Sequence, residues 1–202
     1  MAENTATTPA PQPEYYVRSF PAPGLRQIVR HITGNTPDGK SRFLESDSGE
    51  HYRFMVENRA VANIIYSTQE TPVDLNDNKD VFKAHEKEPP FHYPNGSIVR
   101  MIDFGPGVES PWHRAMTIDY GVVIEGVFEL TLDSGEKRIM RQGDVSIQRA
   151  TNHMWKNIHG NGTLPGRMLW ILLDCKEVIV DGKKVEGDLG DLHKEYAGRG
   201  NY

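Results

Sequence analysis

The stretch Gly107–Gly126, GVESPWHRAMTIDYGVVIEG, decides the fold together with a second stretch, Gly143–Asn157, GDVSIQRATNHMWKN. Each places one histidine in a strand-like run beside glycines that allow turns, His113 in the first and His153 in the second. The first stretch also contains Asp119. Two imidazoles and a carboxylate from separate strands can hold one divalent metal ion in a small β-barrel and leave coordination positions open for chemistry. His113, Asp119 and His153 are therefore the candidate catalytic and metal-binding residues.

The spacing of His113 and Asp119 requires the chain to reverse between them. A strand rises about 3.3 Å per residue, so one straight strand would hold the two residues roughly 20 Å apart. Bonds from zinc to nitrogen or oxygen are only about 2 Å long, which makes a corner at 114–117, RAMT, necessary for a shared ion. Beyond the corner, alternation places Asp119 and Val123 on one face of a strand.

Further side chains are predicted around the same cavity. Arg100 either grips an acidic or enolate group at the barrel mouth or lies on the surface of its strand, and the sequence leaves both open. Arg149 precedes the turn at TNH, which favours the rim of the pocket. The predicted substrate-binding residues are Arg100, Met101, Val123, Arg149, Trp155 and Asn157. The predicted lining mixes Met101, Val123, Met154 and Trp155 with few charges, which predicts an oxygenated and fairly apolar substrate.

The remaining sequence predicts one all-β domain with extensions. The chain has 202 residues, with 19 glycines and 13 prolines, and short apolar runs alternate with turn clusters. We expect a disordered tail over 1–14 and N-terminal strands with a long loop, a lid or arm, over 15–96. The barrel core is expected over 97–180 and a C-terminal extension over 181–202. The loop at 71–96 is polar and interrupted by prolines.

Charge and composition exclude several partner classes. The formal net charge is −5 and no run of Lys and Arg stands out, so neither nucleic acid nor an anionic membrane is an expected partner. No apolar run approaches the roughly 20 residues of a membrane helix, and the N-terminus lacks the pattern of a secretory signal. One cysteine, Cys175, allows no internal disulfide. We expect a cytoplasmic protein.

The two glycine-bounded stretches resemble the two motifs of the cupin superfamily. The first family motif is Gly, five residues, His, one residue, His, three residues, Glu, six residues, Gly. Gly107, His113 and Gly126 match it, while Ala115 stands at the second histidine and Asp119 at the glutamate. In the second motif Gly143 matches, Arg149 and Thr151 replace a proline and a glycine, His153 comes one residue early, and Asn157 follows it at the family spacing.

The resemblance implies a single cupin barrel, a double-stranded β-helix or jelly roll. More narrowly, the chain is similar to bacterial and fungal single-domain cupins that tailor polyketide or aromatic secondary metabolites. This resemblance implies a metal-dependent oxidoreductase, or a proton-transfer enzyme for dehydration, isomerisation or cyclisation. The metal ion at the site would be Fe, Zn, Mn or Ni. Ala115 removes one ligand of the family pattern.

Two alternatives remain open from sequence. Without a metal, His153 beside Asp119 would act as a general base, or the two histidines would hydrogen-bond a ligand. A cupin that binds a small molecule without converting it also fits. Apolar alternation on both faces of 119–126 predicts a homodimer.

Overall fold

The computed structural model describes residues 15–197. The tail expected over 1–14 and the last part of the C-terminal extension, 198–202, lie outside the described residues.

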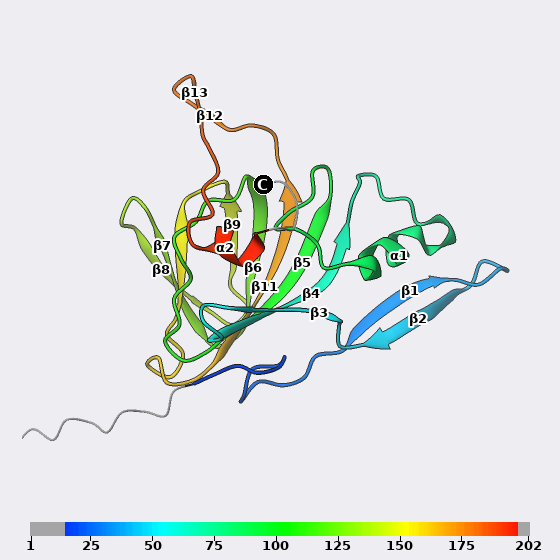
Figure 1. Ribbon diagram of the computed structural model, residues 1–202, viewed down its shortest axis with the longest axis horizontal. Helices are drawn as coiled ribbons and strands as arrows, with labels where there is room; N and C mark the ends of the chain where they lie inside the picture. The colour runs from blue at the N-terminus through cyan, green and yellow to red at the C-terminus, as the bar shows by residue number, and fades with distance from the viewer. Residues whose placement is uncertain (1–14, 198–202) are drawn as a thin grey trace, which may run out of the picture.

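Two antiparallel sheets form the walls of a barrel (Figure 1). The larger sheet has the strand order β3 (His51–Met55), β4 (Ala60–Thr68), β5 (Ser97–Phe104), β11 (Gly166–Asp174), β6 (Thr117–Glu125) and β9 (Val145–Arg149). The smaller sheet has the order β10 (His153–Asn157), β7 (Val127–Leu132) and β8 (Lys137–Arg141). The prediction of an all-β barrel is confirmed.

The core lies between the sheets because the barrel strands alternate inward and outward side chains. On β6 and β10 every second residue is buried. Aromatic side chains join the two walls: the rings of Phe104 and Phe128 lie 5.4 Å apart, and those of Trp155 and Trp170 lie 6.0 Å apart. Both pairs are edge-to-face contacts, a geometry that aromatic rings favour.

A segment before the first strand covers the outer face of the larger sheet. Its buried side chains are Val17, Phe20, Ala22, Leu25 and Ile28, and they pack with Val61 of β4. The hairpin of β1 (Arg30–Asn35) and β2 (Ser41–Asp47) follows and extends away from the barrel (Figure 1). A turn at 35–39 closes this hairpin, with Gly39 at a φ of 79°.

The stretch 71–96, expected to be a loop, contains a helix. After a short 3-10 turn, η1 (Asn76–Asn78), α1 (Lys79–Glu86) packs against β4 and buries Val81 and Ala84. The expectation of an irregular loop across this whole stretch was wrong. Only two apolar residues, three positions apart, attach α1, and so weak a pattern does not identify a helix in a polar sequence.

The C-terminal extension leaves the barrel and then returns to it. Beyond β11 it forms the small hairpin of β12 (Ile179–Val180) and β13 (Lys183–Lys184), and it ends in α2 (Leu192–Tyr196) (Figure 1). Leu192 and Tyr196 are buried against the barrel core. None of the helices within 15–197 is long and apolar enough to cross a membrane.

Candidate functional site

A small cavity of about 70 Å³, the inner cavity, lies among the buried aromatic residues of the barrel. Its wall includes His113, Asp119 and His153, which come from three different segments of the chain. The structure therefore brings the three candidate residues to one place.

The predicted corner is the point where the chain crosses between the sheets. Residues 109–113 run antiparallel to β10, and His113 and His153 exchange two backbone hydrogen bonds, of 3.1 and 3.0 Å. The chain then turns through 114–116, and β6 begins in the larger sheet at Thr117. This crossing places His113 on the smaller wall and Asp119 on the larger one.

Both histidines are held in the same tautomer by local hydrogen bonds. Nδ1 of His113 lies 2.8 Å from the carbonyl oxygen of Pro111, and Nδ1 of His153 lies 2.9 Å from that of Thr151. A carbonyl oxygen only accepts, so each Nδ1 has the proton and each Nε2 keeps a lone pair. The two ring centroids are 4.3 Å apart. The result is a pair of adjacent nitrogen donors.

Burial keeps both imidazoles uncharged. It lowers the pKa of His113, and the hydrogen bond to Pro111 opposes this only in part. The pKa of His153 falls to about 3, first because of burial and then because of the neighbouring His113. At neutral pH the pair is therefore neutral, the form in which imidazole binds metal ions and accepts protons.

Asp119 is a buried carboxylate with an unused acceptor. Its Oδ1 is buried and has no hydrogen-bond partner among the described residues. Burial raises the pKa of Asp119 to about 6, against the opposing effects of the Thr117 hydroxyl and the Arg100 cation. A carboxyl group in this range can take up or release a proton near neutral pH.

Arg100 is buried in the wall of the inner cavity and does not lie on a strand surface. Its Nη2 donates hydrogen bonds of 2.7 and 2.6 Å to the carbonyl oxygens of Pro90 and Phe91. The guanidinium also lies over the rings of Phe91 and Tyr196, at 4.9 and 5.3 Å from their centroids. Arg100 thus places a fixed positive charge beside Asp119.

Two indoles make much of the remaining wall apolar. Trp155 is buried beside His153, with 6.3 Å between the ring centroids, and lines the inner cavity as predicted for its face of β10. The Trp170 indole lies against Gly121, where a Cβ atom would come within 3.0 Å of its Nε1. The glycine between Asp119 and Val123 thus leaves room for this ring.

Three predicted lining residues do not line the inner cavity. Met101 follows Arg100 on β5, faces the opposite side and packs against the N-terminal segment. Arg149 is exposed, because the inward residue at that end of β9 is Gln148. Val123 faces inward but is packed within the core and does not reach the inner cavity.

Asn157 stabilises the barrel and does not line the inner cavity, although it was predicted to contact the substrate. Its side-chain amide donates hydrogen bonds to the carbonyl oxygens of Phe104, Gly105 and Leu164, and its Oδ1 accepts one from the His159 N–H. It therefore closes the end of the barrel by joining three segments of chain.

The chemistry of the donor set fits a metal ion in part. Two neutral imidazoles with free Nε2 atoms are suitable ligands, and the unpartnered Asp119 oxygen lines the same cavity. Within residues 15–197, however, no three His, Cys, Asp or Glu side chains are arranged as one metal-binding group. Ala115, at the place of the second motif histidine, offers no further donor.

Three further residues line the inner cavity together with the predicted set and were not predicted from the sequence: Phe91, Leu192 and Tyr196. The apolar residues Leu189, Leu192 and Tyr196 follow one another at spacings of three and four, a helical pattern that was available in the C-terminal extension.

Comparison with known proteins identifies the family of this chain. A family model described as "Cupin domain" matches residues 100–172. The chain is 74% identical over 186 residues to the cupin-domain-containing oxidoreductase srdD of Neurospora crassa, covering 92% of this chain and 95% of that protein. It is 57% identical over 201 residues to the cupin-domain-containing oxidoreductase fogC of Aspergillus ruber, covering 98% and 99%. Oryzines biosynthesis cluster protein J of Aspergillus oryzae is 40% identical over 178 residues, covering 86% and 98%. With relatives this similar over nearly their whole length, the chain belongs to the cupin-domain family.

Proposed function

We propose that this protein is a small-molecule oxidoreductase that acts at the inner cavity on an oxygenated, fairly apolar polyketide or aromatic secondary metabolite. The observation that supports this most is the meeting of two neutral imidazoles and an unpartnered carboxylate in one buried, aromatic-walled cavity. The names of its relatives, oxidoreductases and a protein of a biosynthesis cluster, support the reaction class and a role in biosynthesis.

The residues of the site supply proton transfer and orientation. A substrate hydroxyl or enol at the inner cavity donates to Oδ1 of Asp119, which has no other partner among the described residues. Above a pH of about 6 Asp119 is ionised and accepts that proton. Arg100 stabilises the negative charge that remains on the substrate oxygen, and the indoles of Trp155 and Trp170 exclude water.

A divalent metal ion, one of Fe, Zn, Mn or Ni, completes this proposal. The Nε2 atoms of His113 and His153 would hold it, with Asp119 as the remaining candidate ligand on the cavity wall. Bound iron would supply the electron transfer to O₂ that an oxidation requires, and zinc would polarise a substrate oxygen. The cytoplasmic location and the homodimer stay predictions.

Elemental analysis and site variants test the proposal. We expect one metal ion per chain after loading with Fe(II) or Zn(II), and its loss in His113→Ala and in His153→Ala. His31→Ala, at an exposed residue of the β1–β2 hairpin, is the matched control and should keep the metal.

Turnover is measured as O₂ uptake and loss of substrate, with phenols and enolisable ketones as the panel. The proposal is wrong if the loaded protein holds no metal and both cavity variants keep full activity. Ligand binding without any substrate loss would favour the alternative, a cupin that binds but does not convert.

A further inference from the structure

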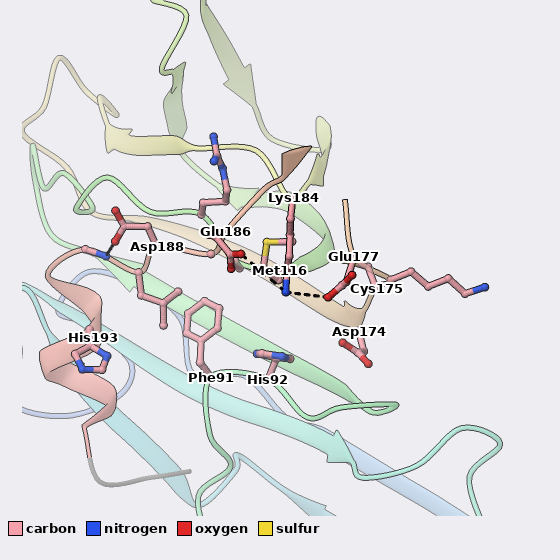
Figure 2. A pocket seen from close by; sticks show the side chains of 16 residues that line it. Phe91, His92, Met116, Asp174, Cys175, Glu177, Lys184, Glu186, Asp188 and His193 are labelled. Atoms are coloured by element: carbon pink, nitrogen blue, oxygen red, sulfur yellow. Dashed lines mark hydrogen bonds and ion pairs between the residues drawn. The ribbon is translucent and has the colours of Figure 1, made fainter. Parts of the chain in front are cut away.

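A second and larger cavity of about 640 Å³, the outer cavity, lies beyond the inner one. Figure 2 shows its lining, with Phe91 and His92 on one side and His193 of α2 on another. The C-terminal segment 175–190, called here the strap, forms much of its wall. Two backbone hydrogen bonds between Arg114 and Asp188 attach the strap to the corner after His113.

The two cavities are neighbours along the same segments of chain. On β11, Leu172 lines the inner cavity and Asp174, two residues further on, lines the outer one. At the corner, His113 lines the inner cavity and Arg114 the outer one. Phe91 lines both, so it lies where the two cavities meet.

The sizes of the two cavities assign them different roles. Sites for small organic molecules usually measure about 300–1,000 Å³. The inner cavity, at about 70 Å³, has room for a functional group only, whereas the outer cavity, at about 640 Å³, has room for a molecular body. A substrate that reacts between His113, His153 and Asp119 must therefore keep most of its atoms outside the inner cavity.

The lining of the outer cavity favours an uncharged, apolar occupant. Phe91, Ala115, Met116 and Leu189 give it an apolar surface. Two of its cations are paired with carboxylates: Lys184 pairs with Glu177 at 2.8 Å and with Glu186 at 3.9 Å (Figure 2), and Arg114 pairs with Asp133 at 3.4 Å. Such pairs do not form the cluster of cations that an anionic ligand needs.

We propose that the outer cavity binds the apolar body of the substrate, an elongated molecule whose oxygenated end passes Phe91 into the inner cavity. This inference rests on the proposed function for the position of the reacting end. The strap closes the site from outside: a Cβ atom at Gly187 would come within 3.0 Å of the Met116 side chain, so the strap lies directly on the apolar surface.

A series of probes tests the proposal: phenol, 4-ethylphenol, 4-butylphenol and 4-hexylphenol. Dissociation constants come from calorimetry, and the contact with the inner cavity comes from shifts of the imidazole NMR signals of His113 and His153. Because burial of one methylene group contributes about 0.8 kcal/mol, we expect the Kd to fall about three- to fourfold per methylene. Phenol itself should already shift the histidine signals.

Variants of Leu189 locate the effect. Leu189→Asp should remove the dependence on chain length, and Leu189→Ala should weaken that dependence. Leu75→Asp, at an exposed leucine that lines neither cavity, is the matched control and should behave as the unmodified protein. If Leu189→Asp does not fold, the test is the weaker dependence of the Kd on chain length in Leu189→Ala.

Two further outcomes are informative. An unchanged dependence on chain length in both Leu189 variants overturns the assignment of the outer cavity. A dependence that Leu189→Asp removes, without any shift of the histidine signals, supports the outer site and contradicts the proposed function.

Discussion

A single carboxyl group, that of Asp119, gives the inner cavity its sensitivity to pH. Its pKa of about 6 in the folded chain exceeds the ordinary value of 3.8, so the folded state binds this proton more tightly than the unfolded state does. The stability that the neutral carboxyl contributes is complete below a pH of about 4 and is lost as the pH rises through 6. The difference in pKa corresponds to an upper value on the order of 3 kcal/mol.

We therefore predict that Asp119→Asn stabilises the fold at pH 8 and not at pH 4. Asparagine is neutral at every pH and has nearly the same shape, so it avoids the cost of a buried charge. The measurement is urea unfolding between pH 4 and pH 8, with Asp77→Asn as an exposed control. A free-energy difference that does not change with pH would show that Asp119 titrates at an ordinary value.

Asn157 and Met101 show where the sequence did not determine the role of a residue. The face of Asn157 follows from alternation, but its hydrogen-bond partners on Phe104, Gly105 and Leu164 come from distant segments that no local pattern identifies. For Met101 the necessary rule was available, since consecutive residues on a strand point to opposite faces and Arg100 already faces inward. The corner after His113 was predictable because bond lengths require it.

The strands were more predictable than the two helices. β5 and β11 coincide with apolar runs bounded by turn residues, and the glycine-containing sequence at 132–136 closes the β7–β8 hairpin around Gly135. α1 and α2 are short, and tertiary contacts hold them where the local sequence is mostly polar. α1 has too few apolar residues to show a period of 3.6, and the pattern of Leu189, Leu192 and Tyr196 at α2 extends over only eight residues.

α2 covers the inner cavity, and its attachment can be tested. The buried Tyr196 ring lies under the Arg53 guanidinium at 4.5 Å, Arg53 also binds the carbonyl oxygen of Glu195, and the Glu195 side chain accepts the Val56 N–H at 2.8 Å. We predict that a chain ending after Asp191 keeps the barrel but exposes His113 and His153. Their modification by diethyl pyrocarbonate should become at least tenfold faster, as followed by peptide mass spectrometry.

The matched control for this truncation is a chain that ends after Ala197. It retains α2, so its histidines should react at the rate of the full chain. Equal rates in both truncated chains would mean that α2 does not restrict access to the inner cavity.

At the scale of the whole molecule, one buried ion pair joins the N-terminal segment to the barrel. Arg167 of β11 donates to both carboxylate oxygens of Asp103 on β5, at 2.5 and 2.8 Å, and to the Arg26 carbonyl oxygen at 2.7 Å. Asp103 also accepts the N–H of Ala22 at 2.8 Å, and the Arg167 guanidinium lies over the Phe20 ring. The pair therefore fastens residues 20–26 to the outer face of the larger sheet.

We predict that Arg167→Met destabilises the fold by about 3–5 kcal/mol, because it leaves the fully buried Asp103 without its countercharge. Adding Asp103→Asn should recover part of this loss, since a neutral amide still accepts the Ala22 N–H and no unpaired charge remains. Urea unfolding of the three proteins at pH 7 measures both effects. The prediction is wrong if the free energy of unfolding of Arg167→Met lies within about 1 kcal/mol of that of the unmodified chain, or if the double variant is less stable than Arg167→Met. Either result would show that packing alone holds the N-terminal segment in place.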